Sequence, residues 1–481
     1  MQFHRKIMKE YDLIIIGSGV GLRLLGKAID QGFKVAMIER GPSGGTCLNR
    51  GCIPTKILTY LADVIQEAKH LKELGVKVTI DEIDYPWIMQ RMRERVNGMS
   101  AGQEKWMEST ENVNFFNGIG VFVDEYVLEV NGEKLTAPNI IIASGSRPLI
   151  PDIAGLGNVE YLTNDEALHL MEQPKSMLIV GGGYVATEFG HFFSAVGTEV
   201  TIIGRNPYLV KNEDPDVSEL LKQELAMRMS VHVNHEVIEV REKDGKKIVK
   251  AVNRKTGEHV EFEGEVLLIA AGRRSNSDLL HPETSGVDVD KNDWIIVDDY
   301  FRTSKKRIWS LGDAINRYQF RHVANEENNV VWNNLMQLHN EKDNEKPTLS
   351  KMNYHAIPRA VFSFPPIATV GMTLKEAKQS ELNIEVAETD YSWVAKGFAM
   401  GNPPSLFRMI VDGDSRKIIG ATIVGPHAPI LIQEIINLMY TSEGTDKKML
   451  EAIHIHPALS EIVQRSLYQL KPLENGDAEN K

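Results

Sequence analysis

The stretch YDLIIIGSGVG, residues 11–21, decides the fold that we expect for this chain. Its nearly continuous apolar run, YDLIII, is typical of a buried parallel strand and ends directly in a glycine-rich turn. Residues 22–31 then have helical spacing, and a second apolar run, KVAMIE, ends at Glu39. The order of strand, turn, helix, strand and acid predicts a βαβ dinucleotide-binding unit.

The same pattern returns in the middle of the chain. Residues 176–180, SMLIV, lead into GGGYVATEFG, a helix to about Val196 and a second strand, TEVTII. One glycine-rich turn is weak evidence, whereas two in strand–turn–helix context are strong. We therefore predict two dinucleotide-binding units.

Length and composition limit the class of protein. A chain of 481 residues suggests about three domains. The net charge of −12 argues against a nucleic-acid partner, and no apolar run reaches the length of a membrane span. Two cysteines do not make a secreted disulfide scaffold. We expect a soluble cytoplasmic protein without a metal site. Met8 offers an alternative start, from which residues 1–7 would be an upstream extension.

A third domain of α+β type begins at about Leu349. The segments AVFSFPPIATVGM, FRMIVD and KIIGATIVG predict strands of an antiparallel sheet, and helices follow through residues 427–470. The strands that end in ASGSRP (143–148) and AAGRRSN (270–276) each precede an expected crossover between domains. The polar end of the chain predicts a solvated tail.

The first unit carries the residues that a dinucleotide needs. Gly17 and Gly19 let the backbone approach a pyrophosphate, which the N-terminus of the next helix favours. Glu39 lies where a carboxylate accepts hydrogen bonds from ribose hydroxyls. Leu22 replaces the usual third small residue, so we expect the helix to pack further from the strand.

The second unit differs at its ribose position. Gly181, Gly183 and Ala186 form the turn, but the expected acid is Gly204, and Arg205 and Lys211 follow it. Arginine and lysine favour a 2′-phosphate that an acid would repel. We interpret this unit as an NADPH site, with NADH as the second choice. The alternative is that both cations are ordinary solvated charges.

The stretch GGTCLNRGCIPTK, residues 44–56, holds both cysteines of the chain. A hydride from the second site needs an acceptor, and a flavin in the first site is the natural relay to a Cys47–Cys52 disulfide. Pro54 is accepted in the first turn of a helix, and the helix N-terminus and Lys56 should lower a thiol pKa. The alternative is a pair of buried structural thiols.

An acid–base group for this dithiol is predicted in HIHPALSEIV, residues 454–463. His456 precedes Pro457, and Glu461 can hold its imidazole in one tautomer and stabilise its charged form. His454 competes for the role.

These motifs together resemble the class I flavin disulfide reductases, from Tyr11 to about Leu470. This family includes dihydrolipoyl dehydrogenase, glutathione reductase, mycothione reductase and mercuric reductase. The resemblance implies that Cys47 attacks substrate and that Cys52 forms a charge-transfer thiolate beside FAD. It places Lys56, paired with Glu188, near flavin N5, and it places Asp313 of SLGDA on the ribityl chain.

The family builds its active sites across a homodimer. The resemblance therefore implies that His456, with Glu461, acts on Cys47 of the partner subunit, and that the third domain is the dimer interface. Thr46 and Gly272 are further candidates for cofactor contacts.

The resemblance also implies a glutathione-reductase-like division of the chain. Residues 1–150 would form the first part of the FAD domain and residues 274–348 its second part. Residues 151–273 would bind NAD(P)H, residues 349–471 would form the dimerisation domain, and residues 472–481 would be the tail.

The particular member is less sharply indicated. The extra C-terminal cysteines of mercuric reductase are missing, and Tyr184 resembles the gate of glutathione reductase. GRRSNSDLL, RHVANEENNVV, VAKGFAM and IHPALSE look most like mycothione reductase, whose turn also departs at Leu22. Residues 454–457 match the HxHP of dihydrolipoyl dehydrogenases, but Ala458 and Gly204 replace their threonine and acid.

We therefore expect NADPH-dependent reduction of a low-molecular-weight disulfide, as in a mycothione or glutathione reductase. The first alternative is a dihydrolipoyl dehydrogenase that oxidises lipoyl groups with NAD. The second is a redox-sensing flavoprotein with little turnover.

Overall fold

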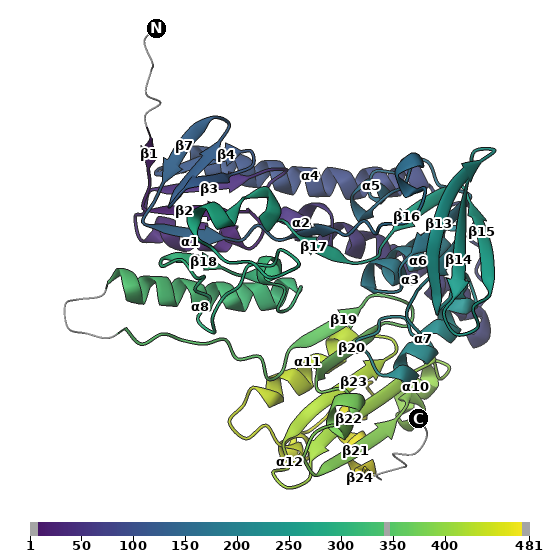
Figure 1. Ribbon diagram of the computed structural model, residues 1–481. Coiled ribbons are helices and arrows are strands. Elements are labelled where there is room, and N and C mark those ends of the chain that lie inside the picture. Colours follow the sequence, from purple (N-terminus) through teal and green to yellow (C-terminus); the bar gives the residue numbers. More distant parts are fainter. Residues whose placement is uncertain (1–7, 341–346, 474–481) are drawn as a thin grey trace.

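The structure is a computed structural model that describes residues 8–340 and 347–473. The extension expected at residues 1–7 lies outside the described residues. Two α/β units lie next to each other along the upper part of Figure 1, and an α+β domain lies below the second unit. The predicted fold class is confirmed.

The first unit is built on a parallel sheet whose order is β18-β8-β2-β3-β4. All four residues of the central strand are buried, which explains its apolar run. Strand β18 follows the second unit in the sequence, so the chain leaves the first unit and later returns to it. The strands are β2 (Leu13–Ile16), β3 (Val35–Glu39), β4 (Val113–Asn117), β8 (Asn139–Ile142) and β18 (Ile308–Ser310).

Helices cover this sheet, and a smaller sheet of order β1-β7-β6-β5 adjoins it. Asp84 begins the longest helix by accepting a hydrogen bond from Trp87 N at 3.0 Å. The helices are α1 (Gly21–Asp30), α2 (Gly45–Asn49), α3 (Cys52–His70), α4 (Tyr85–Ser109) and α8 (Arg321–His339). The strands of the smaller sheet are β1 (Lys9–Glu10), β5 (Val121–Asp124), β6 (Val127–Val130) and β7 (Glu133–Thr136).

The second unit has a parallel sheet of order β12-β11-β10-β16 and an antiparallel sheet of β13, β14 and β15. Its first strand β10 has the predicted bounds, Ser176–Val180, and its first long helix, α6 (Tyr184–Val196), ends where predicted. Its other elements are β11 (Glu199–Ile203), α5 (Asn164–Ala167), α7 (Pro215–Ala226), β12 (Ser230–His232), β13 (His235–Lys243), β14 (Lys246–Asn253), β15 (His259–Gly264) and β16 (Val266–Ile269).

The two expected crossovers lie against each other. Strands β9 (Ser146–Pro148) and β17 (Arg273–Ser275) pair in antiparallel orientation, with Ser146 opposite Ser275. The chain therefore enters and leaves the second unit through one two-stranded ribbon.

The first position of each glycine-rich turn must be glycine for the same structural reason. A Cβ on Gly17 would lie 2.2 Å from Ala143 O, and one on Gly181 would lie 2.2 Å from Ala270 O. In both units the turn therefore passes the end of the neighbouring strand of the sheet too closely for any side chain. The close helix–strand approach that we expected to be lost at Leu22 falls instead at Gly21, where a Cβ would lie 2.8 Å from Ile15 Cγ2.

The third domain has a six-stranded antiparallel sheet of order β19-β20-β23-β22-β21-β24. Lys471 and Pro472 form the edge strand β24, so the tail expected from residue 472 begins later, because its first residues pair with β21. Residues 474–481 lie outside the described residues. The elements are β19 (Pro358–Val361), β20 (Ile367–Gly371), α9 (Leu374–Lys378), β21 (Ile384–Thr389), α10 (Ala395–Ala399), β22 (Leu406–Asp412), β23 (Ile418–Val424), α11 (Ala428–Met439), α12 (Asp446–Glu451) and α13 (Glu461–Ser466).

Across residues 8–340 and 347–473, no helix is both long and apolar enough to cross a membrane. The same residues contain no cluster of three or more His, Cys, Asp or Glu side chains suited to a metal ion.

Candidate active site

One continuous cavity of about 2520 Å³ lies between the three domains. It is larger than an ordinary small-molecule pocket of roughly 300–1,000 Å³, as two dinucleotide cofactors would require. Most of the predicted site residues line it: Gly17, Gly19, Glu39, Thr46, Cys47, Cys52, Lys56, Gly183, Glu188, Arg205, Lys211, Gly272 and Asp313. Gly181 and Ala186 of the second turn are not among the lining residues, and neither are His456 and Glu461, which lie in the third domain.

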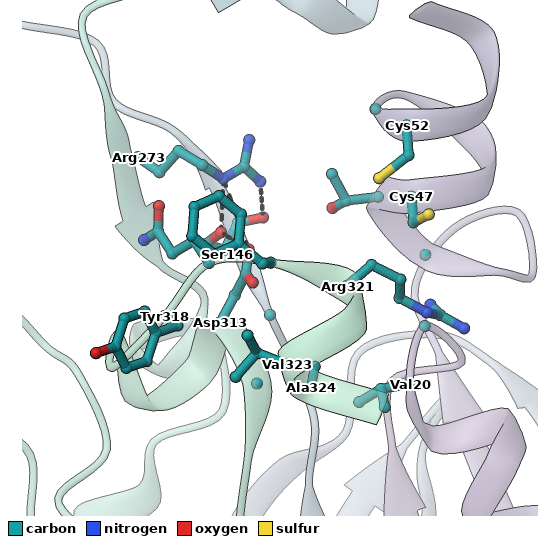
Figure 2. Close-up of a pocket in the computed structure, with 18 of the residues that line it drawn as sticks. Val20, Cys47, Cys52, Ser146, Arg273, Asp313, Tyr318, Arg321, Val323 and Ala324 are labelled. Carbon is teal, nitrogen blue, oxygen red and sulfur yellow. Dashed lines mark hydrogen bonds and ion pairs between the residues drawn. The ribbon is translucent and has the colours of Figure 1, made fainter. Parts of the chain in front are cut away.

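The two cysteines lie on consecutive helices along one wall of this cavity (Figure 2). Cys47 is in the short helix α2, and Cys52 is the first residue of the 19-residue helix α3. Both are free thiols, and neither is buried in apolar surroundings as a structural thiol would be. The free N–H groups at the start of α3 favour a thiolate.

When the dithiol loses one proton, the negative charge lies on Cys47 rather than on Cys52. The pKa of Cys47 is lowered from 9.0 to about 7, chiefly by a hydrogen bond from the Cys52 thiol and to a lesser extent by the charges of Arg321 and Lys56, while burial opposes the shift. The pKa of Cys52 is raised, chiefly by the same hydrogen bond. The negative charge thus lies on the thiol expected to attack substrate, and the charge-transfer role of Cys52 stays a prediction. Arg321, at the start of α8, was not foreseen from the sequence.

Reduced Cys47 should therefore react with iodoacetamide along a titration curve with its midpoint near pH 7. Because the donor from Cys52 makes the largest contribution, Cys52→Ala should move the midpoint toward 9.0. Mass spectrometry of the labelled peptide over pH 5–10 measures both midpoints. A midpoint near 9 in the unaltered dithiol would contradict this charge distribution.

Lys56 and Glu188 form the expected pair across the contact between α3 and α6. Lys56 Nζ lies 2.5 Å from Glu188 Oε2. Phe362, which the sequence did not single out, completes the group: its backbone N–H donates to Glu188 Oε1 at 3.3 Å, and its ring lies 4.2 Å from Lys56 Nζ. The ammonium is thereby held beside the dithiol.

Asp313 is held at the opposite wall of the cavity (Figure 2). Ser146 Oγ donates to Asp313 Oδ2 at 2.7 Å, and Arg273 Nε lies 3.8 Å from the same oxygen. Arg273 also donates to Ser146 Oγ at 2.7 Å. Both partners come from the crossover ribbon, so strand pairing between distant segments orients this carboxylate.

The first unit fits the adenosine and pyrophosphate parts of FAD. Glu39 lines the cavity while Ser18 N and Oγ each donate to its Oε2 at 2.8 Å, which orients the carboxylate for ribose hydroxyls. A Cβ on Gly45 would lie 2.7 Å from Gly19 Cα, so two glycine turns form one narrow cradle. Ser144 Oγ, in the same cavity, is buried and has no partner among the described residues.

Two cations of the second unit, Arg205 and Lys211, lie in the loop that follows β11. Arg205 and Lys211 are exposed, line the cavity and have no carboxylate partner within the described part of the chain. Gly204 provides no acid between them and the turn. Tyr184 lies at the start of α6, with its ring against Phe320 and its buried hydroxyl unpaired among the described residues.

The two candidate histidines differ in exposure and in hydrogen-bond partner. His454 is 5% exposed and its Nε2 lies 2.8 Å from Glu434 Oε1, so it is held inside the third domain. His456 is 64% exposed, and its Nδ1 lies 3.0 Å from Glu461 Oε1. The carboxylate orients the ring and leaves Nε2 facing outward. Of the two, only His456 is available to another subunit.

A dithiol and a lysine–glutamate pair between two dinucleotide-binding units define an oxidoreductase that moves electron pairs through a disulfide. The chain belongs to the pyridine nucleotide-disulphide oxidoreductase family, whose main domain matches residues 11–327. The dimerisation domain of the same family matches residues 357–467.

Proteins with assigned names resemble the chain over most of its length. Mycothione reductase of Mycobacterium tuberculosis is 33% identical over 470 residues, which cover 96% of this chain and 100% of the relative. Mercuric reductase of Lysinibacillus sphaericus is 32% identical, covering 87% and 75%. Dihydrolipoyl dehydrogenase of Chlamydia muridarum is 30% identical, covering 94% and 95%.

Among solved structures, the Cu(II) complex of the HOCl-induced flavoprotein disulfide reductase RclA from Escherichia coli has a TM-score of 0.83 at 25% identity. The similarity covers 96% of this chain and 99% of that one. The relatives therefore share the disulfide-reductase fold but carry several different names.

Proposed function

We propose that this protein uses NADPH to reduce a low-molecular-weight disulfide of the mycothione or glutathione type. The observation that carries the proposal is the pair of cations Arg205 and Lys211, which have no carboxylate partner among the described residues and lie beside an acid-free strand end at Gly204. A guanidinium and an ammonium favour the 2′-phosphate that distinguishes NADPH from NADH. The similarity to mycothione reductase over 96% of the chain supports the substrate class.

Gly17, Gly19, Glu39 and Asp313 would hold FAD in the first unit, where the flavin would supply a two-electron relay between the nucleotide and the Cys47–Cys52 disulfide. The Cys47 thiolate then attacks one sulfur of the substrate and forms a mixed disulfide, while the first substrate thiolate leaves. Cys52 attacks Cys47, releases the second thiolate and re-forms the internal disulfide. Two protons and one electron pair are consumed for each disulfide reduced.

His456 acts as the acid in this sequence. Its imidazolium, stabilised by Glu461, protonates the first leaving thiolate. Because the imidazole lies outside the cavity of its own subunit, we propose that it serves Cys47 of the partner in a homodimer. Lys56, held by Glu188, provides positive charge beside the dithiol while it is reduced.

Arg205→Ala should raise the KM for NADPH by about tenfold or more, because a charge-assisted contact to phosphate is lost. The KM for NADH should change little, since NADH has no 2′-phosphate. Steady-state kinetics with both nucleotides measure this. Arg241→Ala is the matched control: it removes an equal charge from the same unit, where Glu261 already pairs it at the surface. Equal effects on both nucleotides would contradict the NADPH site.

The second candidate function is dihydrolipoyl dehydrogenase, which would run the same exchange toward NAD. Residues 454–457 and the similarity to the Chlamydia enzyme favour it. Anaerobic titration of the yellow holoenzyme with NADPH and with NADH, monitored at long wavelength, separates the two. Reduction by NADH at much lower concentrations than by NADPH would favour the dehydrogenase.

A further inference from the structure

The loop that carries both proposed phosphate ligands, residues 204–214, is tied to its own glycine-rich turn. Val210 N donates to Gly182 O at 2.6 Å, and Ser218 Oγ donates to Leu209 O at 2.8 Å. Val210 has φ of 41°, an unfavourable value for a β-branched residue, so the surrounding contacts hold it there. Lys211 projects next to this point and lines the cavity.

The other end of the loop, at residues 212 and 213, forms hydrogen bonds and an ion pair with the third domain. Glu213, whose side chain is 1% exposed, accepts from Arg359 Nε at 2.7 Å and from Arg359 Nη2 at 3.3 Å. Arg359 Nη2 also donates to Asn212 O at 3.3 Å, and Thr369 Oγ1 donates to Glu213 Oε2 at 2.7 Å. A bidentate, buried pair of this kind restricts both its partners and the backbone beside Lys211.

The next residue of the loop is held by the same domain. Asp214 accepts from the buried Arg408 Nη1 at 2.9 Å, and from the backbone N–H groups of Leu374 and Lys375 at 2.9 and 3.0 Å. The carboxylate of the second unit thus caps a helix of the third domain. Two consecutive acids fix the end of the loop against a different domain.

Strand β19 connects this anchor to the redox centre. It carries Arg359, and Phe362 follows it directly at the Lys56–Glu188 pair. This short segment therefore contacts the loop of residues 204–214 through Arg359, and it contacts the Lys56–Glu188 pair through Phe362. This arrangement fits a role in placing the nucleotide relative to the dithiol.

We propose that the Arg359–Glu213 pair is a positioning element for the pyridine nucleotide. By holding residues 212–214 against the third domain, the pair places Lys211 and Arg205 where they meet the nucleotide phosphate. The inference rests on the proposed nucleotide function of the second unit. Neither residue is expected to touch the reacting atoms.

The test is equilibrium binding of 2′,5′-ADP and of 5′-AMP to the oxidised holoenzyme by isothermal titration calorimetry. Because loss of one partner would leave a buried charge, the main variant is the double substitution Arg359→Met with Glu213→Gln. We expect it to weaken binding of 2′,5′-ADP by about tenfold. The KM for the nucleotide should rise to a similar extent, while the KM for the disulfide stays unchanged. Arg359→Lys, which keeps the charge but loses the fork, should lie between the double variant and the wild type.

Arg416→Gln is the matched control. Arg416 bonds Glu385 and Asp446 within the third domain, so its loss should lower Tm and leave 2′,5′-ADP affinity unchanged. If the double variant also lowers Tm without changing nucleotide affinity, the pair is only structural and the proposal is overturned. If the wild type binds 5′-AMP as tightly as 2′,5′-ADP, the proposed selection of NADPH is contradicted. The positioning role is then tested with 5′-AMP: weaker binding in the double variant supports it, and unchanged binding overturns it.

Discussion

Cys47→Ser and, separately, Cys52→Ser are each expected to lower disulfide turnover by on the order of 10³-fold or more. Thiol–disulfide exchange needs a thiolate at both positions, one to attack the substrate and one to resolve the mixed disulfide. A serine hydroxyl stays protonated and does neither. Steady-state oxidation of NADPH in the presence of the disulfide measures the loss.

The same variants contain their own control. Reduction of an artificial dye by NADPH needs the nucleotide and the flavin but not the dithiol, so it should persist in both variants. The flavin content should also be unchanged, because Glu39 and Asp313, rather than the thiols, are proposed to hold the cofactor. Full disulfide turnover in either variant would contradict the dithiol mechanism.

His456→Ala should lower disulfide turnover by about 10²–10⁴-fold, the usual contribution of a general acid. Glu461→Gln should produce a smaller loss, since the ring keeps a partner but loses the charge that stabilises the imidazolium. His454→Ala is the matched control in the same loop. Its side chain is turned inward to Glu434, so turnover should change little.

Mixing two inactive variants tests whether the site is shared between subunits. In a heterodimer of Cys47→Ser and His456→Ala chains, one site would combine an intact Cys47 with an intact His456 of the partner subunit. Co-expression should therefore restore about one quarter of wild-type activity, because about half of the dimers are mixed and each has one complete site. No recovery in the purified heterodimer would place both residues of each site in a single chain.

Several features of the protein follow directly from local sequence. The buried run before Gly17 predicts a central strand, and the turn after it must contain glycine because the chain passes against Ala143 O. The repeat of this pattern at Gly181 predicts the second unit for the same reason. These patterns are readable because backbone geometry and burial act over a few neighbouring residues.

Other features were misjudged or missed because they depend on pairing over long distances. Lys471 and Pro472 open a segment that is polar overall, yet they add an edge strand to β21. The ribbon that brings Ser146 and Arg273 onto Asp313 joins segments separated by more than a hundred residues. No local periodicity indicates such partners.

The sequence by itself determined the two dinucleotide-binding units, the position of both thiols in one turn and the absence of an acid at Gly204. Each of these depends on residue type at a local position. Only the tertiary structure decided that His456 rather than His454 faces outward, and that Arg359 grips Glu213 from another domain. The physical reason is that hydrogen bonds and ion pairs between domains depend on how whole elements pack, and packing brings together residues whose sequence neighbours carry no sign of the contact.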